Sequence, residues 1–106
     1  MLCVYCTGPG KPLKVQAMAI YSTEIAVWWQ DVPPINKNGI ITEYEVLYRK
    51  VSSKIANSLL STNLSTTLRN LEVFTTYSIT VRAYTIIGPG PESEPPVEVT
   101  TEPSSK

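Results

Sequence analysis

Two cysteines near the start of the chain, Cys3 and Cys6, have the spacing C-x-x-C. This spacing can serve as a redox dithiol or as half of a structural zinc site. The redox role requires the pair at the start of a helix in a βαβ unit, and no such pattern surrounds it. A structural zinc site requires four ligands, but the sequence has no histidine and no third cysteine. We therefore expect two free thiols in a flexible leader, and neither a metal nor a cofactor.

The other polar side chains give no pattern typical of catalysis. Without histidine, the usual general base at neutral pH is missing. Glu43 and Glu45 are two residues apart, so a strand would place both on its solvent side, together with Arg49. The segment 88–90 resembles a phosphate-binding loop only superficially, because Pro89 lacks the backbone N–H that a phosphate requires. We expect this chain not to be an enzyme.

One tripeptide could carry a modification. Asn63-Leu64-Ser65 is an acceptor sequence for N-glycosylation, and it lies in a predicted loop. A chain of this composition contains about one such sequence by chance, so the motif alone does not indicate secretion. The position is compatible with glycosylation of Asn63.

Length and composition limit the function classes. The chain has 106 residues, of which 42% are hydrophobic and 17% are charged, which suits one domain with its own core. Its nine basic and nine acidic residues give no net charge, which argues against nucleic-acid binding. No apolar run approaches the ~20 residues that span a bilayer, so we expect no membrane contact by this domain itself.

Alternating apolar residues predict the elements that must position any functional side chain. Strict alternation is typical of a strand with one buried and one solvated face. The clearest runs are Ile25, Val27, Trp29; then Ile41, Tyr44, Val46, Tyr48; then Tyr77, Ile79, Val81, Ala83. With four weaker runs, the predicted strands span residues 13–19, 24–30, 40–50, 55–60, 66–71, 75–84 and 95–101. Seven strands without a helix pattern predict an all-β, two-sheet sandwich, whose functional residues lie on loops or exposed faces.

The order and spacing of these residues resemble the fibronectin type III family over residues 12–101. The shared string is Ile25-x-Val27-x-Trp29, Pro33-Pro34, Asn38-Gly39-x-Ile41-x-x-Tyr44-x-Val46-x-Tyr48-Arg49, Leu68-x-x-Leu71-x-x-x-Thr75-x-Tyr77-x-Ile79-x-Val81-x-Ala83 and Gly88-x-Gly90. Phe74 departs from the family, which usually carries proline there. The resemblance implies an immunoglobulin-like sandwich of seven antiparallel strands over residues 9–102, after a flexible leader at 1–8 and before a polar tail at 103–106.

The resemblance also implies structural roles. Trp29 is expected between the two sheets, and Tyr44 and Leu71 are expected in the same core. Tyr77 is expected to form a tyrosine corner, in which its hydroxyl binds a backbone group near Leu71. A buried tyrosine requires such a hydrogen-bond partner.

Two surfaces could contact a partner. Leu47 and Arg49 point outward from one strand, and Arg82 and Tyr84 from a strand that is its neighbour in the family. Exposed apolar and aromatic groups beside arginine are enriched in protein interfaces. The alternative is an ordinary sheet surface on which an arginine stacks against a tyrosine. The second surface is the closing segment, whose four glutamates, Glu92, Glu94, Glu98 and Glu102, are expected to have no basic partner. Charge and proline there are also typical of a strand protected against edge pairing.

We therefore expect a non-catalytic spacer and protein–protein interaction module of a larger, extracellular cell-surface adhesion or receptor protein. Its partners would be proteins, including neighbouring domains. The string Pro33-Pro34…Asn38-Gly39-Ile40-Ile41-x-x-Tyr44 is similar to modules in the ectodomains of receptor tyrosine phosphatases and neural adhesion molecules. Two alternatives remain open: an intracellular cytoskeletal or muscle scaffold module, and an accessory domain of a secreted carbohydrate-active enzyme.

Overall fold

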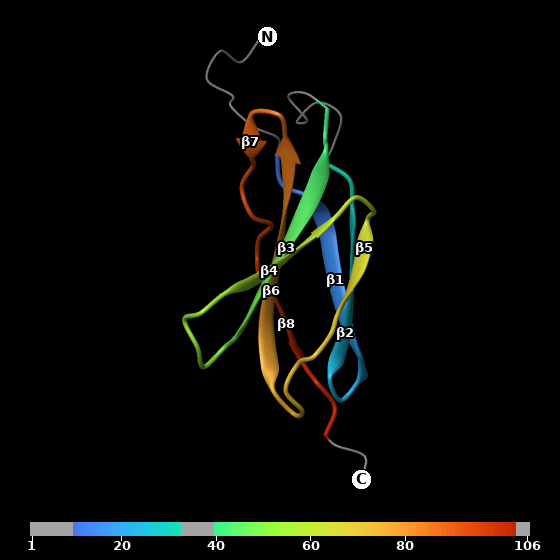
Figure 1. Cartoon of the computed structure of the whole chain (residues 1–106), viewed down its shortest axis with the longest axis vertical. Helices are drawn as coiled ribbons and strands as arrows, with labels where there is room; N and C mark the ends of the chain where they lie inside the picture. The colour runs from blue at the N-terminus through green and yellow to red at the C-terminus, as the bar shows by residue number, and fades with distance from the viewer. Residues whose placement is uncertain (1–9, 33–39, 104–106) are drawn as a thin grey trace.

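The computed structural model describes residues 10–32 and 40–103, and this part of the chain forms strands and no helix (Figure 1). Cys3, Cys6 and the loop with Pro33, Pro34, Asn38 and Gly39 lie outside the described residues, as does most of the polar tail. The strands are β1 (Leu13–Tyr21), β2 (Glu24–Gln30), β3 (Glu43–Lys50), β4 (Asn57–Ser61), β5 (Ser65–Leu68), β6 (Thr76–Thr85), β7 (Gly88–Pro89) and β8 (Val97–Thr100).

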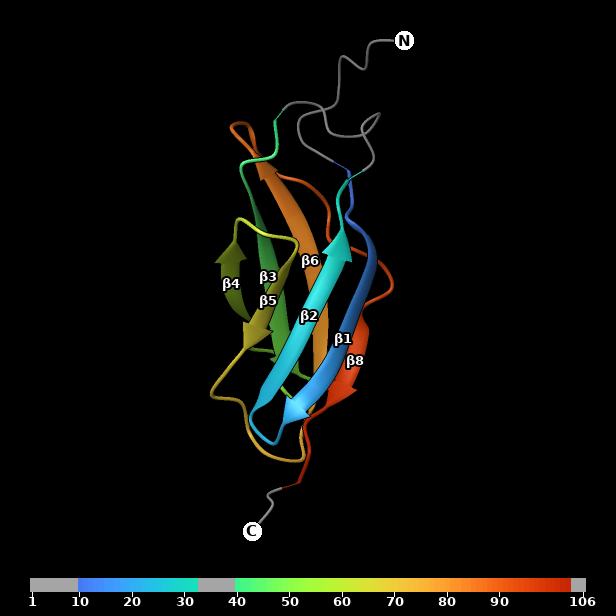
Figure 2. The ribbon, with the colours of Figure 1, turned by 90° about the vertical axis from the view of Figure 1, so that its right-hand side faces the viewer.

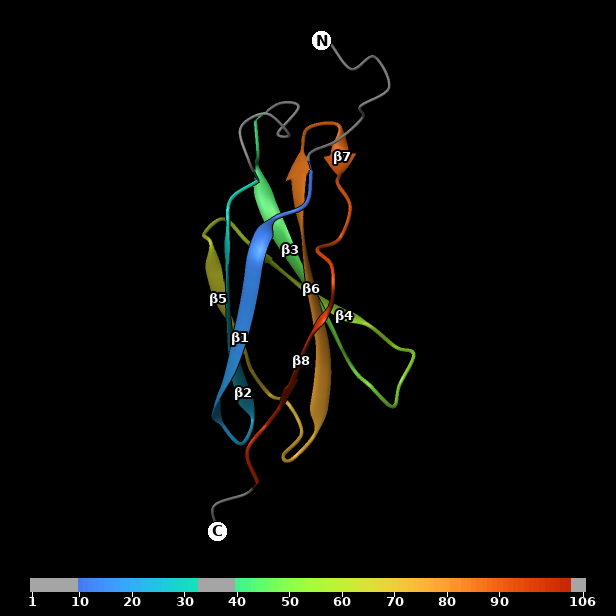
Figure 3. The ribbon, with the colours of Figure 1, turned by 180° about the vertical axis from the view of Figure 1, so that it is seen from behind.

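The strands form two antiparallel sheets that pack face to face. One sheet has the order β1-β2-β5, and the other has the order β4-β3-β6-β7, with β8 also paired to β6. Figure 2 shows β1, β2 and β5 as one layer in front of β3 and β6, and Figure 3, seen from behind the view of Figure 1, shows the two layers side by side. The predicted all-β sandwich is confirmed.

The core lies between the sheets because each long strand turns its alternate side chains inward. In β2, Ile25, Val27 and Trp29 are buried, whereas Trp28 is 38% exposed and donates from Nε1 to Gln16 Oε1 at 2.7 Å. In β6 the same alternation buries one complete face of the strand. The buried core residues are Ile25, Val27, Trp29, Val32, Tyr44, Val46, Leu68, Leu71, Tyr77, Ile79, Val81 and Ala83.

An eighth strand occurs within residues 88–90, where the sequence predicts a rigid hairpin loop. β7 has two residues, and Gly88 and Pro89 pair with Thr85 and Tyr84 at the end of β6. Gly88 has a φ of 142°, which is readily available only to glycine, so the chain can reverse tightly here. The Gly90 N–H then donates to the Ala83 carbonyl at 2.8 Å. The predicted loop is therefore a short hairpin that extends β6.

Near the start of β1, the side chains change the face of the sheet to which they point. The alternation of Leu13, Val15 and Ala17 predicts one common face, but Leu13 is 43% exposed while Val15 and Ala17 pack against the core. Lys14 has a φ of 52°, and the pairing with β2 is irregular between Leu13 and Gln16. A bulge adds one residue to the strand and so turns the preceding side chain to the other face.

The backbone conformation of Phe74 is one that proline cannot adopt. Phe74 has a φ of 47°, whereas the proline ring fixes φ near −65°. The departure of this residue from the family pattern therefore agrees with the local backbone. Position 74 requires a left-handed conformation, which glycine adopts without strain and an aromatic residue adopts only at a cost.

Candidate contact face

The outer face of the five-stranded sheet carries most of the expected contact residues. β3 and β6 pair along eight positions, so side chains that face away from the core lie directly opposite one another. Glu45 lies opposite Arg82, and Leu47 lies opposite Thr80. The register therefore sets a carboxylate beside a guanidinium at the middle of the face.

Glu45, Arg82 and Tyr84 form one polar cluster, which we call the outer-face cluster. Arg82 Nε donates to Glu45 Oε1 at 2.7 Å, and the Tyr84 hydroxyl donates to the same oxygen at 3.1 Å. The Arg82 guanidinium carbon lies 5.6 Å from the centre of the Tyr84 ring, and Arg82 Nη2 lies 3.4 Å from the Tyr84 hydroxyl oxygen. The contacts to the carboxylate and to the ring face hold the arginine in a single orientation.

The outer-face cluster stabilises Glu45 and Arg82 in their charged forms. Partial burial by itself raises the pKa of Glu45, but hydrogen bonds from Arg82, Ser58 and Tyr84, with the charge of Arg82, hold that pKa below its usual value. Burial by itself lowers the pKa of Arg82. The hydrogen bond to Glu45 and the charge of Glu45 together have the larger effect, so the pKa of Arg82 lies above its usual value. The side chains of Arg82 and Glu45 are only 27% and 12% exposed, so solvent screens the pair less than an exposed one.

The four expected contact residues do not form a single patch. Arg82 and Tyr84 join the outer-face cluster, whereas Arg49 turns to the end of β3, where Nη1 donates to the carbonyls of Ser53 at 3.0 Å and Lys50 at 3.4 Å. Leu47 is half-buried and not left in water. The face is therefore better ordered and less apolar than the alternation predicts.

A groove of about 320 Å³ crosses this face beside the cluster. Its lining includes Leu47 and Arg49 from β3, Thr80 from β6, and Glu92 and Pro96 from the segment between β7 and β8. The lining also includes Lys54, so the groove has two cationic side chains, one carboxylate and several apolar groups. This composition suits a peptide segment of a protein partner better than a purely apolar ligand.

The closing acidic segment is more engaged than expected. Glu94 forms an ion pair with Lys11 at 3.1 Å, so the expectation that no basic residue meets these glutamates is wrong for Glu94. Glu92 accepts a 2.7 Å hydrogen bond from the Thr80 hydroxyl. Sequence alone did not reveal these pairings because the residues are brought together by the path of the segment after β7. Glu98 remains on the exposed side of β8, as expected for a protected strand.

The four expected core residues are buried inside the domain. Trp29 is 4% exposed, and its ring lies 5.5 Å from that of Tyr44, at an angle of 60°. The Tyr44 hydroxyl donates to Asp31, and burial, followed by the hydrogen bond and charge of Asp31, raises its pKa well above the usual value. Leu71 and Tyr77 are 7% and 5% exposed. None of these groups is available to a ligand.

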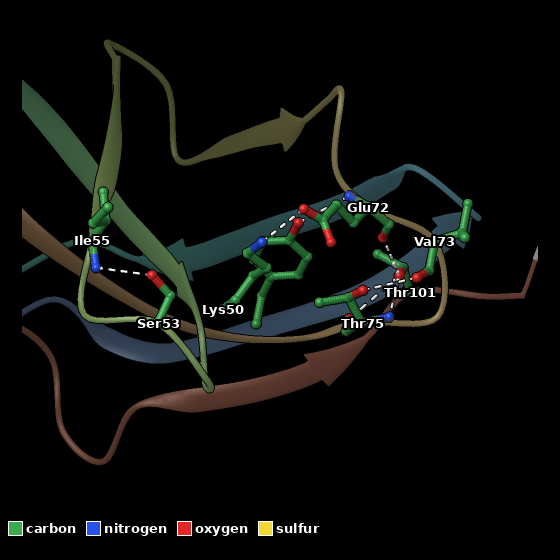
Figure 4. A network of polar contacts seen from close by, with 8 residues as sticks. Lys50, Ser53, Ile55, Glu72, Val73, Thr75 and Thr101 are labelled. Carbon is green, nitrogen blue, oxygen red and sulfur yellow. Dashed lines mark hydrogen bonds and ion pairs between the residues drawn. The ribbon is translucent and has the colours of Figure 1, made fainter.

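A network of hydrogen bonds joins the segment between β5 and β6 to the end of β8 (Figure 4). The Thr101 hydroxyl donates to the Glu72 carbonyl at 2.6 Å and accepts from the Thr75 N–H at 2.9 Å. The Tyr77 hydroxyl accepts from the Glu72 N–H at 2.9 Å, which is the geometry of a tyrosine corner. Thr101 is 1% exposed, so these bonds are shielded from water.

Asn63 lies in the short turn between β4 and β5, and it is exposed. The Ser61 hydroxyl oxygen accepts from the Asn63 N–H at 3.1 Å and lies 3.2 Å from the Ser65 carbonyl oxygen. The backbone of the acceptor tripeptide is thus held by a neighbouring side chain. Its asparagine is accessible to an enzyme on the outside of the domain.

The described part of the chain shows neither a metal-binding cluster nor a membrane-spanning helix. No three histidine, cysteine, aspartate or glutamate side chains in residues 10–32 and 40–103 lie close enough together to hold a metal ion. Within the same ranges, no helix has the length and apolarity needed to cross a membrane.

Sequence reasoning missed the role of Glu45. Alternation places Glu45, Arg82 and Tyr84 on outward faces, but only the register of β3 against β6 shows that they meet. That register depends on the path of the chain between the strands, and periodicity does not report it. The sequence did contain one indication of this contact, namely the opposite charges of Glu45 and Arg82 in two strands that are neighbours in the family.

Comparisons with known proteins agree with this architecture. Residues 10–99 match the family model described as fibronectin type III domain. The chain is 36% identical over 101 residues to human receptor-type tyrosine-protein phosphatase F, and 37% identical over 94 residues to the Drosophila melanogaster protein sidekick. These matches cover 91% and 85% of this chain, but only 5% and 4% of the two relatives. The chain therefore corresponds to a small part of these relatives.

Solved structures show the same fold. The FN5 domain of Drosophila Lar has a TM-score of 0.73 at 26% identity, and the match covers 89% of this chain and 97% of that one. The chicken CNTN1 FN1–FN3 domains have a TM-score of 0.80 at 28% identity, with 89% of this chain and 31% of that one covered. The sandwich, its core tryptophan and tyrosine corner, and the match to the family model all lead to one assignment. This chain belongs to the fibronectin type III domain family.

Proposed function

We propose that this domain is a non-catalytic spacer and protein-contact module in the extracellular part of a larger cell-surface adhesion or receptor protein. The relatives support this proposal, since they are named as a receptor-type phosphatase and as sidekick. The phosphatase activity in the first name belongs to that protein, of which this chain matches 5%. In this proposal the folded unit spans residues 9–102, and residues 1–8 and 103–106 connect it to its neighbours.

The observation that carries the contact role is the outer-face cluster. Ordering a long arginine side chain normally costs conformational entropy when a partner binds. Here Glu45 and Tyr84 already hold Arg82 in place, so part of that cost is met before binding. Arginine and tyrosine are also among the residue types most enriched at binding hot spots. We propose that Arg82 and Tyr84 of this cluster, together with Leu47 and Arg49 of the neighbouring groove, contact a protein partner.

The test is the double change Leu47→Ser plus Tyr84→Ser in the parent ectodomain. Flow cytometry measures how the soluble ectodomain binds to cells that the unmodified ectodomain binds. We expect a weakening of at least about tenfold, equivalent to roughly 1.4 kcal/mol. Thermal unfolding of the isolated domain checks that the variant still folds.

The matched control removes similar side chains from the other sheet. Met18 and Tyr21 are 56% and 62% exposed on β1, and Met18→Ser plus Tyr21→Ser should leave cell binding unchanged. If the control weakened binding as much as Leu47→Ser plus Tyr84→Ser, the outer-face cluster would not be the contact site.

We also propose that Asn63 carries an N-linked glycan when the domain passes through the secretory pathway. Its exposure and its place in a turn support this. Expression behind a signal peptide in mammalian cells, followed by treatment with a peptide N-glycosidase, should lower the mass of the secreted domain. Ser65→Ala should abolish that shift, and Ser65→Thr should retain it. An unchanged mass in the unmodified domain would refute the proposal.

A further inference from the structure

Phe74 has an unfavourable backbone conformation and an exposed ring. Its φ is 47°, and a bulky residue in this region is a genuine outlier. The side chain is 71% exposed, so its burial in this domain does not compensate for the strain. The preceding residue, Val73, is 43% exposed. Glycine would adopt the same backbone without strain, so folding alone does not account for an aromatic ring here.

The backbone of Phe74 is fixed to the point where the chain leaves the domain. The Phe74 N–H donates to the Glu102 carbonyl at 3.1 Å, and the Thr101 N–H donates to the Thr75 carbonyl at 2.9 Å. The turn with Val73 and Thr75 is therefore joined by hydrogen bonds to the residues that follow β8 (Figure 4). Glu102 and Pro103 thus lie close to the backbone of Phe74.

One relative of known structure carries further domains in the same chain. This chain matches 31% of the chicken CNTN1 FN1–FN3 chain, so there a domain of this kind stands in a row with others. Figure 1 shows the start of β1 and the last described residues after β8 at opposite ends of the sandwich, with the hairpin between β6 and β7 at the same end as the start of β1. That hairpin exposes Ile86 by 95% and Ile87 by 61%. This domain thus carries exposed aliphatic side chains at the end opposite to Phe74, where a preceding domain would lie.

We propose that Val73 and Phe74 form a docking surface for the next domain, C-terminal to Pro103, in the parent protein. This inference depends on the proposed role as a module in a row. A short connection raises the effective concentration of the next domain at this surface, so a small apolar contact is enough to restrict the hinge. The strained, exposed ring is then a positioning residue between two domains.

The test uses a two-domain fragment that contains this domain and the next domain of the parent. Residual dipolar couplings report whether the two domains share one alignment tensor, and calorimetry reports the thermal midpoint of each. In Phe74→Gly we expect the two tensors to diverge and the midpoint of the next domain to fall by about 4 °C or more. The isolated domain should keep or raise its own midpoint, because the backbone strain is relieved.

Two variants separate the ring from the backbone. Phe74→Ala keeps the strain of a side-chain-bearing residue and removes the ring, and it should uncouple the domains as Phe74→Gly does. Ile86→Ala, at the opposite end, should leave the coupling unchanged.

Unchanged tensors and midpoints in both Phe74 variants would overturn the inference. It would also be overturned if the isolated domain dimerised through Phe74 while the coupling in the two-domain fragment did not depend on this residue, because the occupant would then be a second copy. Cell binding by the Leu47 and Tyr84 variant is measured separately, so failure of the proposed contact role remains distinguishable.

Discussion

The adjacent tryptophans of β2 should respond very differently to removal. Trp29 is 4% exposed and packs against Tyr44, whereas Trp28 is 38% exposed and makes one hydrogen bond to Gln16. Truncation of a buried tryptophan to alanine costs about 3–5 kcal/mol. No described residue accepts a hydrogen bond from the Trp29 indole N–H, so Trp29→Ala also relieves an unsatisfied buried donor. We therefore expect a cost near the lower limit, about 3 kcal/mol.

That cost is a large part of the stability of a small domain, which is about 5–15 kcal/mol. With about 4–8 °C per kcal/mol, Trp29→Ala should lower the thermal midpoint by about 12–24 °C. Trp28→Ala loses one hydrogen bond of about 0.5–1.5 kcal/mol, equivalent to about 2–12 °C, and the contacts of a partly solvated ring, so its midpoint should fall by less than that of Trp29→Ala.

The assay is thermal and urea unfolding of the isolated domain, monitored by the fluorescence of the tryptophan that remains. Trp29→Phe is the conservative control: it keeps a ring against Tyr44 and removes the unsatisfied N–H, so it should be much milder than Trp29→Ala. Equal losses in Trp28→Ala and Trp29→Ala would show that the two faces of β2 are not distinguished by burial, and the strand register would then be incorrect.

Three further outcomes are expected from the hydrogen bonds. Tyr77→Phe should cost about 1–3 kcal/mol in urea unfolding, because the Glu72 N–H loses its acceptor; an unchanged midpoint would contradict the tyrosine corner. Thr101→Val, which preserves shape, should also cost about 1–3 kcal/mol, because the Glu72 carbonyl loses a donor at a buried site; Thr101→Ser should retain most of the stability. The folded-state pKa of Glu45 lies below its value in the unfolded chain, so the contribution of Glu45 to stability is present at neutral pH and is lost as the pH falls through the folded-state pKa. Glu45→Gln should lower stability at pH 7 by about 1–2 kcal/mol and reduce the acid-induced loss; unaltered pH dependence would show that Arg82 does not stabilise the carboxylate.

The sandwich could be predicted from sequence because its central strands are amphipathic. In β2 and β6 the apolar side chains recur at every second position, and the structure buries these positions. The predicted ends of the strands were less accurate, because local sterics and turns determine where a strand begins. Ile40 was expected within a strand, but β3 begins at Glu43 and Ile40 is 84% exposed. Similarly, Ile55 precedes β4 and is 75% exposed.

The candidate site was predictable only in part, because it depends on contacts between distant segments. Alternation alone places Arg82 and Tyr84 on an outward face. Their shared contact with Glu45 requires the pairing of β3 with β6, which joins segments that are far apart in the sequence. The left-handed backbone conformation of Phe74 could not be predicted from the sequence either, because aromatic residues rarely adopt this conformation.

The connection between β8 and the rest of the fold would decide how the domain responds to a mechanical pull. The described part of the chain begins and ends at opposite ends of the sandwich, so a pull on its two ends would act along the strands (Figure 1). β8 pairs antiparallel with β6 over four positions, so such a pull shears these hydrogen bonds together and does not peel them one by one. The Thr101 hydroxyl lies where the force enters and ties β8 to Glu72. Under such a pull, the hydrogen bond of this single buried hydroxyl would have to break together with the pairing of β8 and β6.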